Sequence, residues 1–280
     1  MNILITGSSG FVGKQVINAF NEVFANVTLH LVLRPKKGNF NKKSKNIKSI
    51  IFSENIFKES SDWWAHQCAN IDIFINLAWY AEPGKYLDSP LNKECHEGTI
   101  NMAIGAAKSG VRKFVGIGTC FEYKFSTKPL DINSPLDPKS AYAKAKVNTF
   151  HDLEKYFKKN EVDFLWYRLF YLFGEGEDER RLVPYIRKSL SEGKKVELTS
   201  GEKIKDYLNI KDAGTIIAKL AMNKHTGAYN VCSGKGISIR SLAESIADEY
   251  ERRDLLHFGE HEITSYDPPY IVGKKTDPKF

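Results

Sequence analysis

The sequence is poor in cysteine and has no long hydrophobic run. Its four cysteines lie far apart, with no CxxC pair, so we expect neither a disulfide framework nor a zinc ribbon and assign no metal site. No apolar stretch comes near the ~18 residues of a membrane span, so we predict no membrane association. The first expected strand begins at Asn2 and leaves no room for a signal peptide, which predicts a cytoplasmic protein.

Basic residues outnumber acidic ones, with 41 lysines and arginines against 34 aspartates and glutamates. Proteins that bind nucleic acids carry basic residues along one face and interleave them with aromatic side chains. Here the basic residues gather in one local run between Arg34 and Lys48. We therefore predict no nucleic-acid partner; the run is either a solvated loop or part of a site for an anionic small molecule.

Apolar runs alternate with segments of helical periodicity in the first 170 residues. Continuous apolar runs are expected of parallel strands covered on both faces, and the alternation is typical of right-handed βαβ units. The predicted strands are 2–6, 27–33, 47–52, 71–78, 113–117 and 164–169. We predict an α/β fold, with a Rossmann-type doubly wound parallel sheet in residues 1–170 and a small C-terminal α/β substrate domain in residues 171–280. The boundary is soft, and strands after it can return to the first sheet.

Three glycines follow the first predicted strand in the pattern GxxGxxG. Gly7, Gly10 and Gly13 stand between this strand and a helical segment, which is the context of a dinucleotide-binding loop. Glycine lets the backbone approach a pyrophosphate, and the N-terminus of the following helix favours an anion. We therefore predict that this loop binds a dinucleotide. The further contacts predicted in the loop are Ser9, Phe11 and Val12.

The end of the second predicted strand indicates which dinucleotide binds. An acidic residue there would bind the adenosine ribose hydroxyls and repel a 2′-phosphate, but this chain has Arg34, with Lys36 close by. A guanidinium group can bind a phosphate through paired hydrogen bonds. We therefore predict NADP(H) as the preferred cofactor; the alternative is that Arg34 is merely exposed and that NAD(H) is used as well.

A tyrosine and a lysine stand four residues apart in a helix-forming segment. This spacing places Tyr142 and Lys146 on one face of the helix, where the ammonium group lowers the pKa of the phenol and suits it to proton transfer. Thr119 follows a predicted strand and lies at the same edge of the sheet as the glycine loop. These three residues are the candidate catalytic group, with Thr119 donating to a carbonyl oxygen that Tyr142 also contacts.

Four motifs carry a resemblance to a known family. They are Gly7-x-x-Gly10-x-x-Gly13, Asn76-Leu77-Ala78, Thr119-Cys120-Phe121-Glu122-Tyr123 and Tyr142-x-x-x-Lys146. With them the chain resembles the extended short-chain dehydrogenases/reductases, and within these the NAD(P)-dependent nucleotide-sugar epimerases, dehydratases and reductases. Residues 201–212 and 227–234 also resemble segments of this branch.

The resemblance implies roles for the candidate residues. Tyr142 would be the acid/base, Lys146 would bind the nicotinamide ribose and lower the pKa of the tyrosine, and Thr119 would polarise the substrate oxygen. The cofactor contacts that the resemblance adds are Leu77, Ala78 and Asn55, the last of them near adenine. The family also implies a homodimer, formed through a four-helix bundle that includes the Tyr142 helix.

The two residues after Thr119 depart from the pattern of the family's 4,6-dehydratases. Those enzymes have Asp and Glu, whereas this chain has Cys120 and Phe121, so dehydration is disfavoured. The related GDP-fucose synthase has a cysteine acid/base two residues after its Ser or Thr, where this chain has Phe121, so epimerisation at C3 and C5 is unsupported. What remains is NADPH-dependent reduction of the 4-keto group of a nucleotide-diphosphate-linked sugar. The resemblance here is to the 4-keto-6-deoxysugar reductases related to CDP-abequose synthase, enzymes of deoxysugar and O-antigen biosynthesis.

Three alternatives stay open. The chain could be a nucleotide-sugar 4-epimerase with tightly bound NAD, a non-catalytic NADP-binding sensor of the same fold, or a reductase of a non-sugar carbonyl. Substrate contacts are expected from the aromatic residues after Ala78 and from departures from the family pattern in the second half of the chain. The predicted substrate-binding residues are Trp79, Tyr80, Cys120, Phe121, Tyr171, Arg181 and Lys205.

Overall fold

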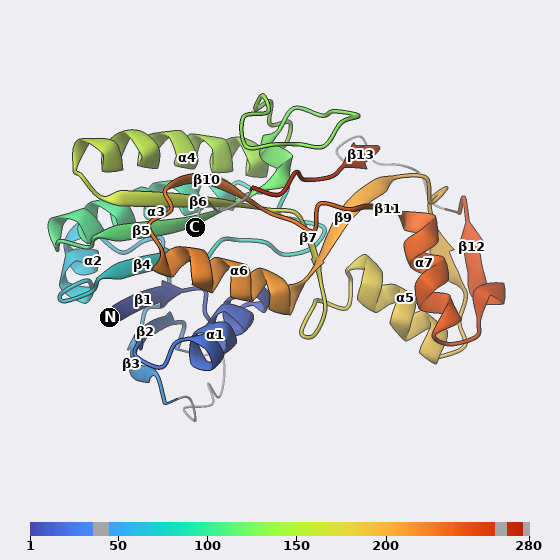
Figure 1. The fold of residues 1–280 in the computed structure, drawn as a ribbon, viewed down its shortest axis with the longest axis horizontal. Coiled ribbons are helices and arrows are strands. Elements are labelled where there is room, and N and C mark those ends of the chain that lie inside the picture. Colours follow the sequence, from blue (N-terminus) through green and yellow to red (C-terminus); the bar gives the residue numbers. More distant parts are fainter. Residues whose placement is uncertain (36–44, 261–267, 277–280) are drawn as a thin grey trace.

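Seven parallel strands form the largest sheet of the protein, running from β10 and β6 at the top of Figure 1 to β3 at the bottom. The computed structural model describes residues 1–35, 45–260 and 268–276. The strand order is β10-β6-β5-β4-β1-β2-β3, so the chain winds outward from β1 in both directions. The strands are β1 (Asn2–Thr6), β2 (Thr28–Leu33), β3 (Ile47–Phe52), β4 (Ile73–Asn76), β5 (Lys113–Thr119), β6 (Asp163–Leu169) and β10 (Gly227–Val231). This confirms the predicted Rossmann-type sheet.

Helices cover both faces of this sheet. The helices on one face are α1 (Phe11–Val23) and α6 (Ile210–Met222), and those on the other are α2 (Ser61–Gln67), α3 (Leu91–Lys108) and α4 (Ala141–Lys159). Successive side chains of a strand point to opposite faces, so Ile3 and Ile5 of β1 pack with α1 while Leu4 packs against the other layer. Burial on both sides explains why the strands read as continuous apolar runs.

A smaller region follows residue 170, on the right of Figure 1. Its four-stranded sheet contains β7 (Tyr171–Phe173), β9 (Ile204–Asn209), β11 (Gly236–Ser238) and β13 (Tyr270–Ile271), and a two-stranded sheet joins β8 (Val196–Leu198) to β12 (Leu256–Phe258). Helices α5 (Leu182–Ser191) and α7 (Ile239–Asp248) share an apolar cluster with this second pair. Two short 3-10 helices, η1 (Cys120–Glu122) and η2 (Arg253–Leu255), complete the described elements.

The two regions are not consecutive in the chain. Both α6 and β10 follow residue 170, yet both belong to the layers of the large sheet. The predicted domain boundary at residue 170 therefore does not correspond to a break in the large sheet. The role of residues 171–280 in substrate binding stays a prediction. No helix within the described ranges combines the length and apolarity that a membrane crossing needs.

Buried polar contacts join β9 of the second region to the chain around the end of β10. The carboxylate of Asp206 on β9 accepts hydrogen bonds from the backbone N–H groups of Ser233, Gly234 and Gly273, at 2.7–3.1 Å. Asn230 on β10 accepts from the hydroxyl of Tyr123 at 2.7 Å. Because buried polar groups are costly unless paired, these bonds hold β9 and the segment after η1 in place around the end of β10.

Candidate active site

The glycine loop runs from the end of β1 to the start of α1 and packs closely against Leu77 and Ala78, which follow β4. Gly7 has a φ of +69°, and a Cβ there would lie 2.6 Å from the backbone nitrogen of Ala78. At Gly13 a Cβ would overlap the carbonyl oxygen of Gly7. Glycine is therefore required at Gly7 by both its backbone conformation and its surroundings, and at Gly13 by the surroundings.

The N-terminus of α1 suits an anionic group. Gly10 is its N-cap and supplies no side-chain hydrogen bond, and the first turn contains no acidic residue. The backbone N–H groups of such a turn have no partner within the helix, and the helix dipole adds a partial positive charge. The neighbouring Ser8 hydroxyl is buried and has no partner among the described residues. The residues of this loop therefore fit the pyrophosphate of a dinucleotide.

One cavity of about 480 Å³ connects this loop to the candidate catalytic residues. The predicted cofactor-binding and catalytic residues that line it are Gly7, Gly10, Phe11, Val12, Gly13, Leu77, Thr119, Tyr142 and Lys146. The predicted substrate-binding residues that line it are Trp79, Cys120, Phe121, Tyr171 and Arg181. A cavity of this size holds a drug-sized ligand, and most of the predicted site residues meet in it.

Thr119 is held by the residues that follow it. Its backbone N–H donates to Glu122 Oε1 at 2.8 Å, and its hydroxyl oxygen accepts from the N–H of Phe121 at 3.3 Å. Glu122 is fully buried and forms an ion pair with Arg168 at 2.7 Å. A buried, hydrogen-bonded ion pair is rigid, because breaking it would leave an unpaired charge. Glu122, which sequence reasoning only quoted within a motif, therefore positions the threonine.

Tyr142 is the second residue of α4 and lies in its first turn, two residues after the N-cap residue Ser140. Its backbone N–H donates to the carbonyl oxygen of Leu87 at 2.8 Å. Burial raises the pKa of the phenol above its usual range, and a hydrogen bond with the Thr119 side chain acts in the opposite direction. The phenol is therefore protonated at neutral pH and can donate its proton.

Lys146 lies against Trp79, with its Nζ 3.6 Å from the indole ring centre. Its Nζ also donates to the carbonyl oxygen of Ile117 at 2.6 Å. The side chain is only 2% exposed, and burial lowers its pKa to about 7. The Lys146 Nζ lies 5.7 Å from the centre of the Tyr142 ring, and its lowering of the pKa of Tyr142, against the effect of burial, stays a prediction.

Aromatic side chains surround Tyr142. The ring of Tyr86 meets it edge-on at 4.8 Å between centres, and Trp79 meets it at 6.4 Å. The indole N–H of Trp79 donates to Asn92 Oδ1 at 2.9 Å, which fixes this ring against α3. The guanidinium of Arg181, in turn, lies 5.9 Å from the centre of the Tyr86 ring. These contacts build an aromatic wall beside the phenol, with one cation at its end.

Several predicted cofactor contacts lie away from the cavity lining. Arg34 is exposed directly after β2, and Lys36 lies outside the described residues. Asn55 was predicted near adenine, but its side-chain amide donates to Glu94 Oε1 at 2.7 Å and its oxygen accepts from the N–H of Phe57. Its amide is thus engaged within the protein, which argues against the predicted contact. Ser9 and Ala78 adjoin lining residues without lining the cavity themselves.

Two predicted substrate contacts also have partners within the protein. The hydroxyl of Tyr80 donates to Glu82 Oε2 at 3.1 Å, and Tyr80 does not line the cavity. Lys205 is 2% exposed and donates to the carbonyl oxygen of Pro268 at 2.7 Å. These contacts argue against the predicted substrate contact of Lys205, because the ammonium group is buried and bound within the C-terminal region.

The cavity also contains residues that sequence reasoning missed, above all Glu177. It is half-buried between β7 and α5, and burial raises the pKa of its carboxyl group to about 7. Its neighbour Asp178 also lines the cavity but is bound twice by Arg180, at 2.9 Å. No sequence signal distinguishes Glu177 from the acidic residues around it; only the fold turns it inward.

Comparison with known proteins shows relatives along nearly the whole chain. The dTDP-6-deoxy-L-talose 4-dehydrogenase (NAD(+)) of Aggregatibacter actinomycetemcomitans is 25% identical over 277 residues, which are 98% of this chain and all of that protein. A putative UDP-glucose 4-epimerase of Methanocaldococcus jannaschii is 23% identical over 261 residues, covering 88% of this chain and 82% of that one.

Solved structures share the fold. The UDP-N-acetylglucosamine 4-epimerase from Methanobrevibacter ruminantium, in complex with UDP-N-acetylmuramic acid, has a TM-score of 0.86 at 19% identity and covers 98% of this chain and 89% of that one. A dTDP-glucose 4,6-dehydratase from Streptomyces venezuelae, solved with NAD, has a TM-score of 0.83 at 18% identity over 98% and 88%. Residues 3–232 match the model of the NAD dependent epimerase/dehydratase family. The predicted resemblance is thereby confirmed, and the chain belongs to this family.

Proposed function

We propose that this protein reduces the 4-keto group of a nucleotide-diphosphate-linked sugar with a nicotinamide dinucleotide, and that Tyr142 supplies the proton. One observation carries the proposal: a single cavity joins a helix N-terminus suited to a pyrophosphate with the Thr119–Tyr142 pair. The full-length relative that acts as a 4-dehydrogenase on a dTDP-linked 6-deoxysugar supports the same carbon and the same class of substrate.

Each residue of the Thr119, Tyr142 and Lys146 group would have a separate role in this reduction. A bound nicotinamide dinucleotide would supply the hydride for C4 of the sugar, and the proton must come from the protein. Tyr142, whose pKa is raised by burial, donates that proton to the carbonyl oxygen as it becomes a hydroxyl. The Thr119 hydroxyl donates a hydrogen bond to the same oxygen, which stabilises its developing charge. Lys146, fixed beside Tyr142 by Ile117 and Trp79, would hold the nicotinamide ribose.

The residues after Thr119 do not support elimination of water. Cys120 is buried, and burial raises the pKa of its thiol to about 12. Phe121 has no proton to transfer, and the carboxylate of Glu122 is bound by Arg168. Elimination would require a group at these positions that transfers protons at the neighbouring sugar carbons. The groups present are a neutral thiol, a phenyl ring and a paired carboxylate.

A 4-epimerase is the second candidate, because two of the similar proteins carry that name. They are the protein from Methanocaldococcus jannaschii and the solved structure from Methanobrevibacter ruminantium. Epimerisation would begin with the reverse transfers, which remove a hydride from C4 and a proton from O4, and would then return the hydride to the opposite face of C4. The two functions differ in their use of cofactor: a reductase consumes one dinucleotide for each sugar, whereas an epimerase recycles it.

An assay of cofactor turnover separates these candidates. The purified protein is mixed with NADPH or NADH and with CDP-, dTDP-, GDP- and UDP-linked 4-keto-6-deoxysugars. We expect one sugar to cause stoichiometric oxidation of cofactor and to yield a 4-hydroxyl product. Interconversion of unmodified UDP-hexoses without net cofactor change would establish the 4-epimerase instead. Absence of both reactions, with intact dinucleotide binding, would favour the sensor.

Preference for NADP(H) is a further part of the proposal, and it depends on Arg34. This side chain is exposed at the end of β2, where a 2′-phosphate would lie in this fold. Arg34→Ala should raise the KM for NADPH about tenfold and leave that for NADH nearly unchanged. Equal effects on the two cofactors would contradict the preference.

The homodimer through α4 stays a prediction. Sedimentation of the purified protein tests it.

A further inference from the structure

Asn92 is the second residue of α3 and is buried, with 2% of its surface exposed. Its side-chain oxygen accepts from the indole N–H of Trp79 at 2.9 Å. Its side-chain nitrogen donates to the carbonyl oxygens of Tyr86 at 2.7 Å and of Ser89 at 3.0 Å. These three bonds all go to residues 79–89, which lie between β4 and α3, so one amide holds this segment near both of its ends.

The first end of the segment is the Trp79 ring, which lies over the ammonium group of Lys146. Lys146 Nζ is 3.6 Å from the centre of this ring and donates to the carbonyl oxygen of Ile117 at 2.6 Å. The face of an indole ring attracts a cation, and the attraction is stronger where water is excluded, as it is around this buried lysine. Ile117 and Trp79 together therefore orient the ammonium group, and Asn92 orients Trp79.

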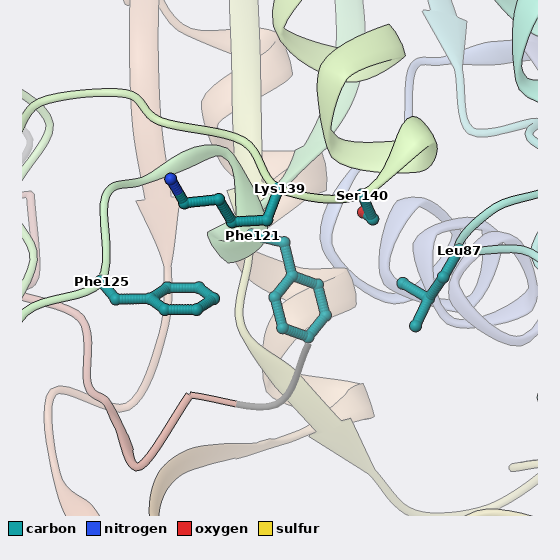
Figure 2. Close-up of a pocket in the computed structure, with 5 residues that line it drawn as sticks. All are labelled: Leu87, Phe121, Phe125, Lys139 and Ser140. Carbon is teal, nitrogen blue, oxygen red and sulfur yellow. The ribbon is translucent and has the colours of Figure 1, made fainter. Parts of the chain in front are cut away.

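The second end of the segment contacts Tyr142. The ring of Tyr86 meets the Tyr142 ring edge-on, with 4.8 Å between their centres. The next residue, Leu87, lines a small notch together with Ser140, the N-cap residue of α4 (Figure 2). The carbonyl oxygen of Leu87 accepts from the N–H of Tyr142 at 2.8 Å. By binding the carbonyl oxygen of Tyr86, Asn92 therefore fixes the stretch of backbone that contacts Tyr142.

Asn92 thus acts on both sides of the proposed reacting group, although it does not line the cavity itself. Loss of its amide would leave buried polar groups unpaired, which costs free energy, so the segment should move to find other partners. A displacement of about 1 Å in a reacting group can slow a reaction about 100-fold. We infer that Asn92 is a positioning residue, which keeps Lys146 and Tyr142 in the arrangement that proton transfer requires. The inference rests on the proposed function, because that function assigns the reaction to these two residues.

The test compares Asn92→Leu with Asn46→Leu. Asn46 is also buried, and its side chain donates to the carbonyl oxygens of Phe20 and Phe24 near the end of α1, so this control removes similar bonds away from the catalytic group. Both variants are assayed well below their melting temperatures. We expect Asn92→Leu to lower kcat about 10–100-fold while the KM for the sugar stays within a few-fold. Asn46→Leu should lower the melting temperature and leave kcat within about twofold of wild type.

Trp79→Phe tests the link between the two side chains. A phenyl ring can still lie over Lys146, but it has no N–H group for Asn92. We expect Trp79→Phe to lower kcat about 3–10-fold, and the double variant with Asn92→Leu to lose less than the product of the two single losses. Losses that multiply would overturn the inference, because the two residues would then act independently. If Asn92→Leu does not fold, Trp79→Phe decides alone, and a kcat equal to that of wild type would overturn the inference.

The outcomes separate this inference from the proposed reduction. If the wild-type protein reduces a 4-keto sugar and Asn92→Leu matches Asn46→Leu in kcat, the inference fails and the reaction stands. If the protein only interconverts unmodified UDP-hexoses and Asn92→Leu selectively loses kcat, the inference is supported and the proposed reduction fails, because epimerisation would also move a proton at Tyr142. If the wild-type protein turns over no sugar, both proposals fail.

Discussion

The two ends of the active-site cavity are built in different ways. The cofactor end consists mainly of backbone, where β1, the glycine loop and the first turn of α1 follow one another in the chain. The substrate end consists of side chains from separate segments of the chain, among them Trp79, Phe121, Tyr171 and Glu177. The first end is thus specified by backbone conformation over a few consecutive residues, whereas the second requires that distant parts of the chain be folded together.

This difference separates two kinds of substitution. At the cofactor end an added side chain should destabilise the loop, because backbone atoms already occupy the space that its Cβ would need. At the substrate end a side chain matters for the atom it presents, so its removal should change chemistry or specificity without loss of cofactor binding. The substitutions below test this separation.

The largest effect is expected for Tyr142→Phe, which removes one oxygen and keeps the ring contacts with Tyr86 and Trp79. Loss of the proton donor should lower kcat about 10²–10⁴-fold. Dinucleotide binding, measured by fluorescence titration, should stay within a few-fold of wild type. Tyr156→Phe, later on the same helix, is the control and should retain full activity. Substantial turnover by Tyr142→Phe would show that another group supplies the proton.

Gly7→Ala tests the cofactor end by adding a side chain, whereas Tyr142→Phe removes a functional group. The added Cβ would lie 2.6 Å from the Ala78 nitrogen at a φ of +69°, so the loop must move or the protein must lose stability. We expect dinucleotide affinity to fall about tenfold or more and the free energy of unfolding to drop by about 1–3 kcal/mol. Gly110→Ala is the matched control, since Gly110 has a φ of +77° but nothing within 4 Å of its added Cβ. Similar losses of affinity in both variants would refute the steric argument.

The same difference explains what the sequence could and could not predict. The strands and the glycine loop were predictable because burial on two faces and a positive φ restrict residue types locally. The role of Lys205 was not, because its ammonium group binds Pro268, 63 residues away, in a contact that no local pattern encodes. Glu177 was equally invisible, since Glu175, Asp178 and Glu179 surround it and only the fold turns it toward the cavity.

Lys146→Met tests the point at which the two ends meet. Burial lowers the pKa of Lys146 to about 7 from its usual value of 10.5, so between these pH values the unfolded chain binds a proton that the folded protein does not. The folded wild-type protein therefore gains stability as the pH rises from 7 to 10, and loses it as the pH falls. In the absence of cofactor, the melting temperature of Lys146→Met relative to wild type should fall as the pH rises over this range. Lys144→Met, at an exposed lysine of the same helix, should show no such trend, and a trend common to both variants would contradict the burial of Lys146.

The smallest effect is expected at Glu177, where a carboxyl group lines the substrate end with its pKa raised by burial to about 7. The folded protein retains a proton there that the unfolded chain releases from pH 4.5 upward, so this group costs stability as the pH rises from 5 to 8. Glu177→Gln should therefore gain stability relative to wild type over that interval. If the carboxylate accepts a hydrogen bond from a sugar hydroxyl, the variant should also raise the KM for the sugar by up to about tenfold and leave kcat and cofactor affinity unchanged. Glu175→Gln, at an exposed carboxylate two residues earlier, is the control, and an equal change in both variants would place Glu177 outside the substrate end.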